Sequence, residues 1–498
     1  MTPTQQTANA RSGARSWLVL AATSTAWFLV LFDDTALAIA LPALGRDLGL
    51  NLPGMEWVIN SYTLAFAVLA LAGGIAADRY SPYTVFAAGV AAFTITSAAA
   101  ALSATGAGLI TTRALQGAAA ALIGPPALAL ILSAFTSTRR ALAIGVWTGT
   151  GAAALATGPM LGAMLTARFG WQSVLWLNVP LGVGIVLIAV STARHQPART
   201  TARTSADLRG LGLAAAGLAG LVLGLTQAAA EGWTARIWAL LAVAVAALPG
   251  FLRFEARLRQ PAVPPTLWRR PHLLAANLLG LASLAIMCSL FFFLALYLQL
   301  AAGTSTIQAG LALLPLTVLA AATAPLSGWL AGKLGPKLLI TSGMLLTAGG
   351  LGILAGIDPS WNPADLTPGL LLAGLGIGLA STPITTEALT HVPQAQSGVA
   401  AAVHTTFRIT GLSAGIAIMG TIVATQWPTG LTASNNIPAA QFAAAISTGF
   451  AVNAGIALAA AILAAAALKS RPPAHRPAPP ASEPAPATAT QPAASNRP

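Results

Sequence analysis

Long hydrophobic runs separated by short polar stretches dominate this sequence from residue 17 to residue 467. A helix needs roughly 20 mostly apolar residues to cross the hydrocarbon core of a bilayer. Fourteen runs reach that length, so the pattern predicts an all-α integral membrane protein with 14 transmembrane helices. The predicted spans are 17–41, 55–77, 83–104, 107–133, 140–166, 172–193, 207–229, 234–252, 272–300, 307–331, 337–356, 367–390, 397–424 and 441–467.

Composition supports a membrane protein and excludes a soluble one. Of the 498 residues, 56% are hydrophobic and only 7% are charged, whereas soluble domains carry about 25% charged residues. The net charge of +13 does not indicate a nucleic-acid partner, because the basic residues lie in short loops between the hydrophobic runs. The single cysteine, Cys288, leaves no intramolecular disulfide and no cysteine-based metal site.

The placement of lysine and arginine predicts the orientation in the membrane. If the N-terminus is cytoplasmic, twenty of the 25 Lys and Arg residues fall in cytoplasmic loops and tails, three on the opposite side and two inside spans. This split supports an even number of spans with both ends on the same side. The number is fourteen, or twelve if the adjacent pair 207–229 and 234–252 does not cross the membrane. We expect a multi-pass plasma-membrane protein with cytoplasmic N- and C-termini.

Two loop segments repeat one pattern. GIAADRYSPYTVF (74–86) and GWLAGKLGPKLLI (328–340) align without gaps, and each follows the second span of a six-span block. The repeat predicts a major-facilitator-type arrangement of two six-helix bundles plus two inserted helices, which is typical of secondary transporters. The predicted parts are a cytoplasmic N-terminal tail, an N-terminal bundle, basic loops with the two inserted helices, a C-terminal bundle and a disordered cytoplasmic tail, at 1–16, 17–193, 194–271, 272–468 and 469–498.

Charged residues inside the spans are the candidate functional groups, because a charge near the bilayer centre costs about 2.5–3.5 kcal/mol. Asp33 lies eight residues before the outer end of its span, about 12 Å deep at 1.5 Å per residue. Arg113 lies six residues into its own span, about 9 Å deep. The two are expected to form a buried pair or to face each other across a cavity, with Gln116 one turn below Arg113.

Such a pair permits two interpretations. A carboxyl group in a low dielectric resists ionisation and a nearby arginine favours it, so changing surroundings can load and release a proton. The alternative is a static ion pair that only holds helices together. We assign proton coupling to Asp33, Asp34 and Arg113, and leave open which acid carries the proton.

Other polar residues in the spans are assigned supporting or structural roles. Gln116, Glu387 and Arg408 are expected to support the coupling residues. For Glu387 and Arg408 a structural role is favoured, which includes pairing with each other or, for Arg408, extension towards the interface. His404 is interpreted as a hydrogen-bonded structural histidine rather than a titrating one.

At these residues the chain resembles the major facilitator superfamily, and within it the drug:proton antiporter branch with fourteen helices. LFDDTALAIALP in the first span is similar to the branch pattern LDxTIVNVALP, and RALQGAAAA in the fourth is similar to RxxQGxgaA. In the superfamily, the arginine at the position of Arg113 is linked to proton transfer. FGWQSVLWLNVPLG, with Trp171, Asn178 and Pro180, matches the branch pattern GWRWIFxINVPIG.

Two further segments resemble motifs that the superfamily links to conformational change. Gly145 and the segment ATGPMLG are similar to the antiporter motif, which lies at a contact between the bundles. The loop after the second span keeps Gly74, Asp78 and Arg79 but carries Ser-Pro-Tyr in place of a glycine and two basic residues. The residues of these motifs are Gly74, Asp78, Arg79, Gly145, Gly158, Pro159 and Gly162.

The resemblance implies a proton-coupled antiporter that exports a small, partly hydrophobic drug or antibiotic by alternating access. Such a protein is not an enzyme and acts as a monomer without cofactor or metal, with the proton as coupling ion and the substrate and lipid bilayer as its partners. One alternative is an exporter or importer of a physiological metabolite, such as an amino acid or a siderophore. Another is a membrane sensor that transports nothing. The sequence does not identify the compound or the proton stoichiometry.

Overall fold

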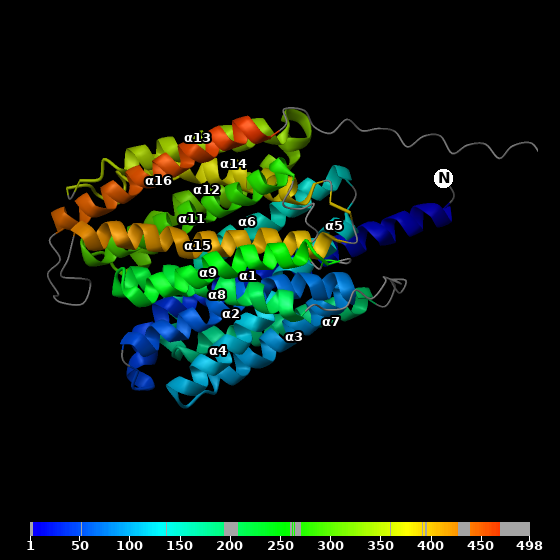
Figure 1. Cartoon of the computed structure of the whole chain (residues 1–498), viewed down its shortest axis with the longest axis horizontal. Coiled ribbons are helices and arrows are strands. Elements are labelled where there is room, and N and C mark those ends of the chain that lie inside the picture. The colour runs from blue at the N-terminus through cyan, green and yellow to red at the C-terminus, as the bar shows by residue number, and fades with distance from the viewer. Residues whose placement is uncertain are drawn as a thin grey trace, which may run out of the picture.

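The computed structural model describes residues 3–50, 52–135, 137–193, 208–258, 261, 263, 270–358, 360–390, 392–393, 396–426 and 439–468. All regular structure in these ranges is helical (Figure 1). The predicted C-terminal tail, 469–498, lies outside them. The helices are α1 (Pro3–Asp47), α2 (Leu52–Arg79), α3 (Pro82–Ala101), α4 (Gly106–Ala121), α5 (Gly124–Ala134), α6 (Ser137–Phe169), α7 (Gln172–Ala193), α8 (Leu208–Glu231), α9 (Ala235–Glu255), α11 (Pro271–Leu300), α12 (Thr306–Leu334), α13 (Pro336–Leu354), α14 (Thr367–Leu389), α15 (Ser397–Gln426) and α16 (Ala439–Ala467).

The described spans agree with an integral membrane protein. Thirteen of them are long and apolar enough to cross a membrane, and α6 makes a fourteenth when its two arms are taken as one bent span. Both inserted helices are present as α8 and α9. Helix α1 is longer than its predicted span, and its first turns extend beyond the other helices (Figure 1).

Prolines explain two departures from straight predicted spans. The predicted span 107–133 is divided into α4 and α5, because Pro125 and Pro126 lack the N–H groups that would continue the helical hydrogen bonds. The predicted span 140–166 corresponds to α6, which bends by 45° between Leu155 and Thr157. Pro159 cannot donate to the carbonyl of Leu155, so the bend lies where that hydrogen bond is missing.

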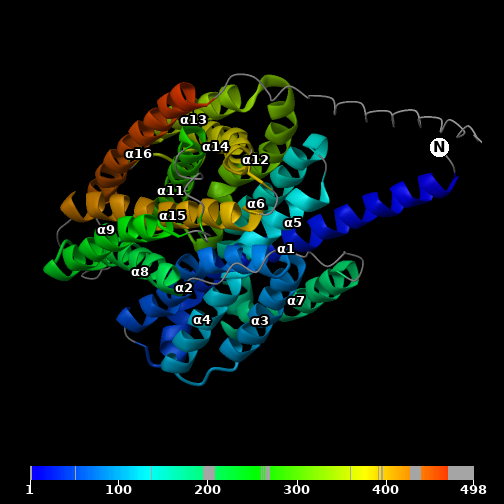
Figure 2. The ribbon, with the colours of Figure 1, turned by 45° about the vertical axis from the view of Figure 1, so that its right-hand side comes forward.

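The two six-helix bundles pack in the same pattern (Figures 1 and 2). In the first, α1 packs on α6 and α7, α2 on α4, and α3 on α4 and α7. In the second, α11 packs on α15 and α16, α12 on α14, and α13 on α14 and α16. Helices α8 and α9 pack on each other, and α8 also contacts α2 and α15, so the inserted pair lies where the bundles meet.

The main contacts between the bundles are two equivalent helix pairs, α2 with α15 and α6 with α12, and α5 with α15 and α6 with α14 add smaller ones. Repeat-related glycines allow both close approaches. A Cβ atom at Gly74 would overlap the carbonyl oxygen of Gly398 on α15, and one at Gly328 would overlap that of Ala141 on α6. The segments that align in the sequence therefore have matching roles in packing.

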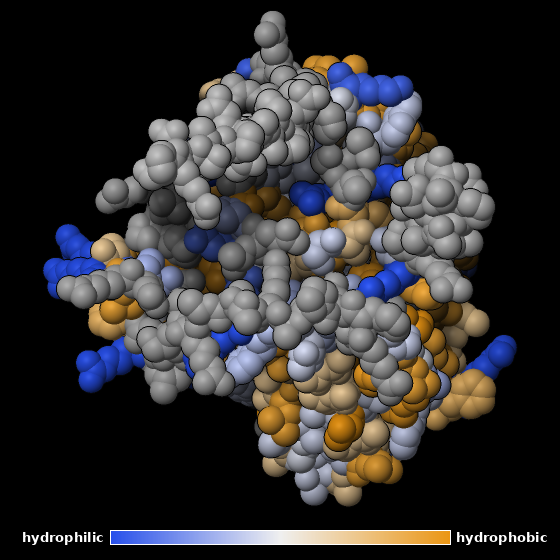
Figure 3. All heavy atoms as spheres, turned by 90° about the vertical axis from the view of Figure 1, so that its right-hand side faces the viewer, coloured by the Kyte–Doolittle hydropathy of each residue, from blue (hydrophilic) through white to orange (hydrophobic). Residues whose placement is uncertain are grey.

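Asp78 adds hydrogen bonds to one of these contacts. Its carboxylate accepts from the backbone N–H groups of Gly398 and Val399, each at 2.8 Å. These groups lie in the first turn of α15, where N–H groups have no partner within the helix. The α2–α15 contact closes the end of the molecule at which α1 begins, and hydrophilic side chains stand at several points around that end (Figure 3).

Substituting Gly74→Ala should destabilise the protein, because the added methyl group would overlap the backbone of α15, which is held in its helix. Overpacking of this kind costs about 1–3 kcal/mol. The measurement is the apparent melting temperature of the purified protein in detergent. Gly212→Ala on α8 is the control, because no atom lies within 4 Å of its Cβ position. A Gly74→Ala variant that melts with the wild type would contradict the packing described here.

Candidate functional site

A fully buried ion pair between Asp33 on α1 and Arg113 on α4 lies inside the N-terminal bundle. Arg113 also donates from Nε to the carbonyl of Val58 at 3.2 Å and from Nη1 to Oε1 of Gln116 at 2.7 Å. The ring of Tyr62 faces the guanidinium with its centre 4.2 Å from Cζ. The buried pair expected from the depths of the two residues is therefore present, with Gln116 beside it.

Asp33 is held by two further side chains. Asn178 on α7 donates to its carboxylate at 2.6 Å, and Gln116 donates at 3.2 Å. Ser97 on α3 accepts from Gln116 at 2.7 Å, so the network joins α1, α3, α4 and α7. Sequence analysis identified Asn178 only as part of a signature and missed Ser97, whose one signal was a hydroxyl group in an apolar span. Since Asp33 does not line the central cavity, this arrangement has the form of a structural ion pair.

Asp34 has different surroundings from its neighbour. It lines the central cavity, and its side chain is 21% exposed, whereas that of Asp33 is fully buried. Its Oδ1 lies 3.5 Å from Nη2 of Arg113 and has no hydrogen-bond partner. One arginine therefore contacts both acids, but only Asp34 adjoins open space.

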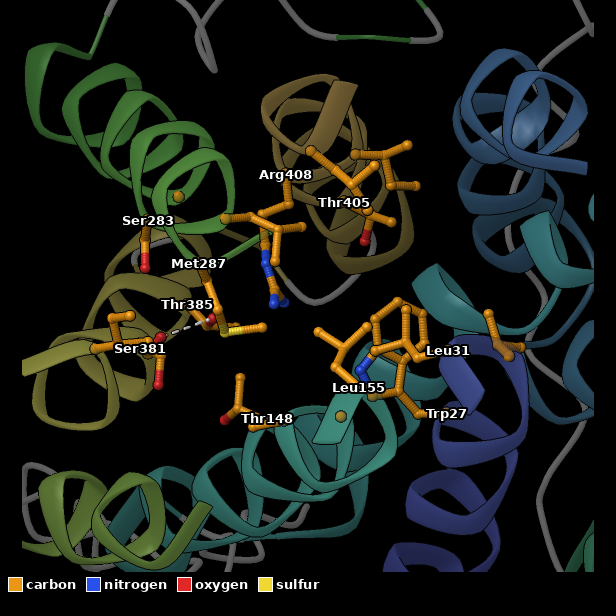
Figure 4. A pocket seen from close by; sticks show the side chains of 18 of the residues that line it. Trp27, Leu31, Thr148, Leu155, Ser283, Met287, Ser381, Thr385, Thr405 and Arg408 are labelled. Atoms are coloured by element: carbon orange, nitrogen blue, oxygen red, sulfur yellow. Dashed lines mark hydrogen bonds between the residues drawn. The ribbon is translucent and has the colours of Figure 1, made fainter. Parts of the chain in front are cut away.

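The cavity lies between the two bundles. Side chains from α1, α2, α6, α11, α12, α14 and α15 line it (Figure 4). Most of the lining is apolar, including Trp27, Phe66, Leu155 and Met287. Hydroxyl groups add polar points, and the residues that supply them are Tyr62, Thr63, Thr148, Ser283, Ser381, Thr385 and Thr405.

Arg408 on α15 extends into this cavity from the C-terminal bundle (Figure 4). The two ion pairs found among the described residues both involve Arg113, so Arg408 does not pair with Glu387. That pairing was one of the expectations from sequence, and it is wrong. Glu387 lies in the last turn of α14, partly exposed and outside the cavity lining.

His404 is fully buried one turn before Arg408, as expected of a structural histidine. Its Nδ1 lies 3.1 Å from Oδ1 of Asn277, and its Nε2 lies 3.3 Å from Oγ1 of Thr385. Within the described ranges, no group of three His, Cys, Asp or Glu side chains is arranged to hold a metal ion.

The residues of the antiporter motif divide between two contacts. A Cβ atom at Gly145 would lie 2.7 Å from the carbonyl oxygen of Ala324 on α12, so this glycine lies at the contact between bundles. Gly158 and Gly162 instead pack against α1 within the N-terminal bundle, where a Cβ atom would overlap Thr35 or Ala36. The expectation that the whole motif lies between the bundles is therefore correct only for its first glycine.

Two repeated helical bundles around a central cavity with buried charges are an arrangement typical of membrane transporters. The Major Facilitator Superfamily profile matches residues 23–416, and the chain belongs to that family of membrane transporters. The human organic anion transporter MFSD10 has a similar fold, with a TM-score of 0.65 over 90% of this chain and 99% of that one, at 14% identity.

Curated relatives are named for antibiotic export or resistance. A tetracenomycin C resistance and export protein of Streptomyces glaucescens is 33% identical over 83% of this chain and 77% of its own length. A cephamycin export protein of Amycolatopsis lactamdurans is 36% identical over 82% and 85%. A puromycin resistance protein of Streptomyces alboniger is 32% identical, again over 82% of each chain.

Replacing Arg113 with lysine should lower both stability and transport. A lysine ammonium group is a point charge and cannot reproduce the planar guanidinium that contacts Asp33, Gln116 and Val58 at once. Leaving buried polar groups without partners costs about 1–3 kcal/mol each. The apparent melting temperature in detergent measures the effect, with Arg168→Lys at an exposed helix end as the control. If the two variants have the same apparent melting temperature, the planar geometry of the Arg113 guanidinium is not needed.

Proposed function

We propose that this protein is a proton-coupled antiporter that exports a small, partly hydrophobic compound of the antibiotic class across the plasma membrane. Its membership of a transporter family and the export and resistance names of its relatives support drug efflux. The observation that carries the proposal is the cavity between the bundles, which has an ionisable carboxylate, Asp34, in its wall.

Asp34 is our choice for the residue that carries the proton. It borders the cavity, and its side chain is partly exposed, so a proton from the cavity can reach it. Asp33 is saturated by Arg113, Gln116 and Asn178, and adding a proton there would break contacts that join three helices. In this proposal Asp33 fixes the position of Arg113, and Arg113 sets how readily Asp34 ionises.

The orientation follows from the lysine and arginine residues, with both termini cytoplasmic. The α2–α15 contact then lies on the cytoplasmic side, and breaking it, including the hydrogen bonds of Asp78, gives access from the cytoplasm. One proton entering down a membrane potential of 100 mV, negative inside, provides about 2.3 kcal/mol, before any pH gradient is counted. The chain is proposed to act as a monomer, because one copy supplies the whole cavity lining.

Asp34→Asn should abolish proton-driven export, because an amide cannot bind and release the proton at this position. Uptake of a radiolabelled panel of antibiotics and of metabolites into everted vesicles, with and without an uncoupler, measures it. Asp47→Asn on the same helix is the control, since Asp47 lies outside the cavity and accepts from Trp171 at 2.8 Å. Uncoupler-sensitive export by the Asp34→Asn variant would refute the assignment.

The Asp33→Asn variant distinguishes the role of Asp33 from that of Asp34. It should lower the apparent melting temperature, because a buried arginine loses its counter-ion, and breaking such pairs costs about 3–5 kcal/mol. Folded Asp33→Asn protein should still release protons when substrate is added to proteoliposomes. If instead Asp33→Asn is stable but uncoupled, Asp33 carries the proton.

A further inference from the structure

Two hydrogen-bond donors face the cavity without partners in the described part of the chain. One is the guanidinium of Arg408 on α15, which extends towards the centre of the cavity (Figure 4). The other is the indole Nε1 of Trp27 on α1, whose ring is 4% exposed and stacks on Trp147 with ring centres 4.6 Å apart. The Trp27 Nε1 atom is buried, and a buried donor without a partner costs about 1–3 kcal/mol. A ligand that supplies acceptor atoms at this point removes that cost.

The charges around the cavity indicate what else the ligand carries. Two acids, Asp33 and Asp34, balance two arginines, Arg113 and Arg408, so the empty site is neutral when all four are ionised. Arg113 is committed to Asp33 and lies 3.5 Å from Asp34. A ligand with only an acidic group would satisfy Arg408 and leave an excess of negative charge in an apolar cavity. A ligand with only a basic group would leave Arg408 without a counter-ion.

We propose that the cavity binds amphoteric compounds, which carry an acidic oxygen group for Arg408 and Trp27 and a basic nitrogen for Asp34 on an apolar, ring-containing body. The two charged contacts come from different bundles, α15 and α1, so the bound compound spans the boundary between them. The apolar side chains between these points, such as Leu31, Phe66 and Met287, cover the ring system. This inference rests on the proposed function, since the basic nitrogen and the transported proton compete for the same carboxylate.

The test uses three fluorescent dyes with closely related ring systems and the purified full-length protein in detergent. They are an aminoxanthene rhodamine with a free carboxylate, its methyl ester, and fluorescein, which has the acid but no amino group. Fluorescence polarisation gives the Kd of each dye for the wild type and for Arg408→Gln, Arg408→Lys and Trp27→Phe. Arg168→Gln removes the same charge at an exposed helix end and serves as the control.

We expect the wild type to bind the free-acid rhodamine more tightly than either other dye. Arg408→Gln should raise the Kd of the free-acid dye by about tenfold to a hundredfold, the range for a hydrogen bond to a charged group, and leave the Kd of the methyl ester unchanged. Arg408→Lys should restore most of the loss. Trp27→Phe, which keeps an aromatic ring and removes the N–H, should raise the Kd of the free-acid dye by about twofold to tenfold. Arg168→Gln should bind all three dyes as the wild type does.

An unchanged ratio of free-acid to ester affinity in Arg408→Gln would overturn the proposal, as would a wild type that prefers the ester or fluorescein. Absence of binding for all three dyes would also count against it. The proposed function is judged separately, by uncoupler-sensitive movement of the free-acid dye in proteoliposomes. Binding with the expected preference but without proton-driven movement would refute the antiport and retain the binding site.

Discussion

The arrangement of the helices around the buried ion pair depends on the need to satisfy one buried arginine. Arg113 lies in an apolar environment, and its partners come from two other helices, α1 and α2, and from its own next turn. In a low dielectric, an unpaired charge costs far more than a lost hydrogen bond in water, so these partners have little freedom to move away. The network fixes α1 against α4 and α7, and thereby fixes which face of α1 borders the cavity.

Adjacent residues on one helix consequently have different chemistry. Asp33 and Asp34 point about 100° apart on a helix, so one faces the interior of the bundle and the other faces the cavity. The interior acid is surrounded by donors, and the cavity acid has an unbonded oxygen. On α15, His404 and Arg408 lie one turn apart, and the histidine is hydrogen-bonded within its bundle whereas the longer arginine side chain reaches the cavity.

Much of this architecture is present in the sequence. Hydrophobic length predicted the membrane helices, and the depths of Asp33 and Arg113 in their spans predicted their pairing. The matching positions of Gly74 and Gly328 in the repeat predicted equivalent bundles, because helix backbones can approach closely only where the residue between them is small. The break between α4 and α5 at Pro125 was missed, since hydropathy alone does not register a missing N–H. The partners of buried polar groups, such as Ser97, depend on how the helices rotate and pack against each other. The periodicity of hydrophobic residues in one sequence does not specify that packing.

The two contacts between the bundles are related by the repeat but differ in chemistry. Asp78 bonds across the α2–α15 contact, whereas its repeat counterpart, Gly332 in α12, has no side chain to offer α6. Separation along the first interface therefore breaks charge-assisted hydrogen bonds of a kind that a glycine at position 332 cannot make. These hydrogen bonds stabilise the conformation seen here, and a rigid-body rotation that separates α2 from α15 must break them first.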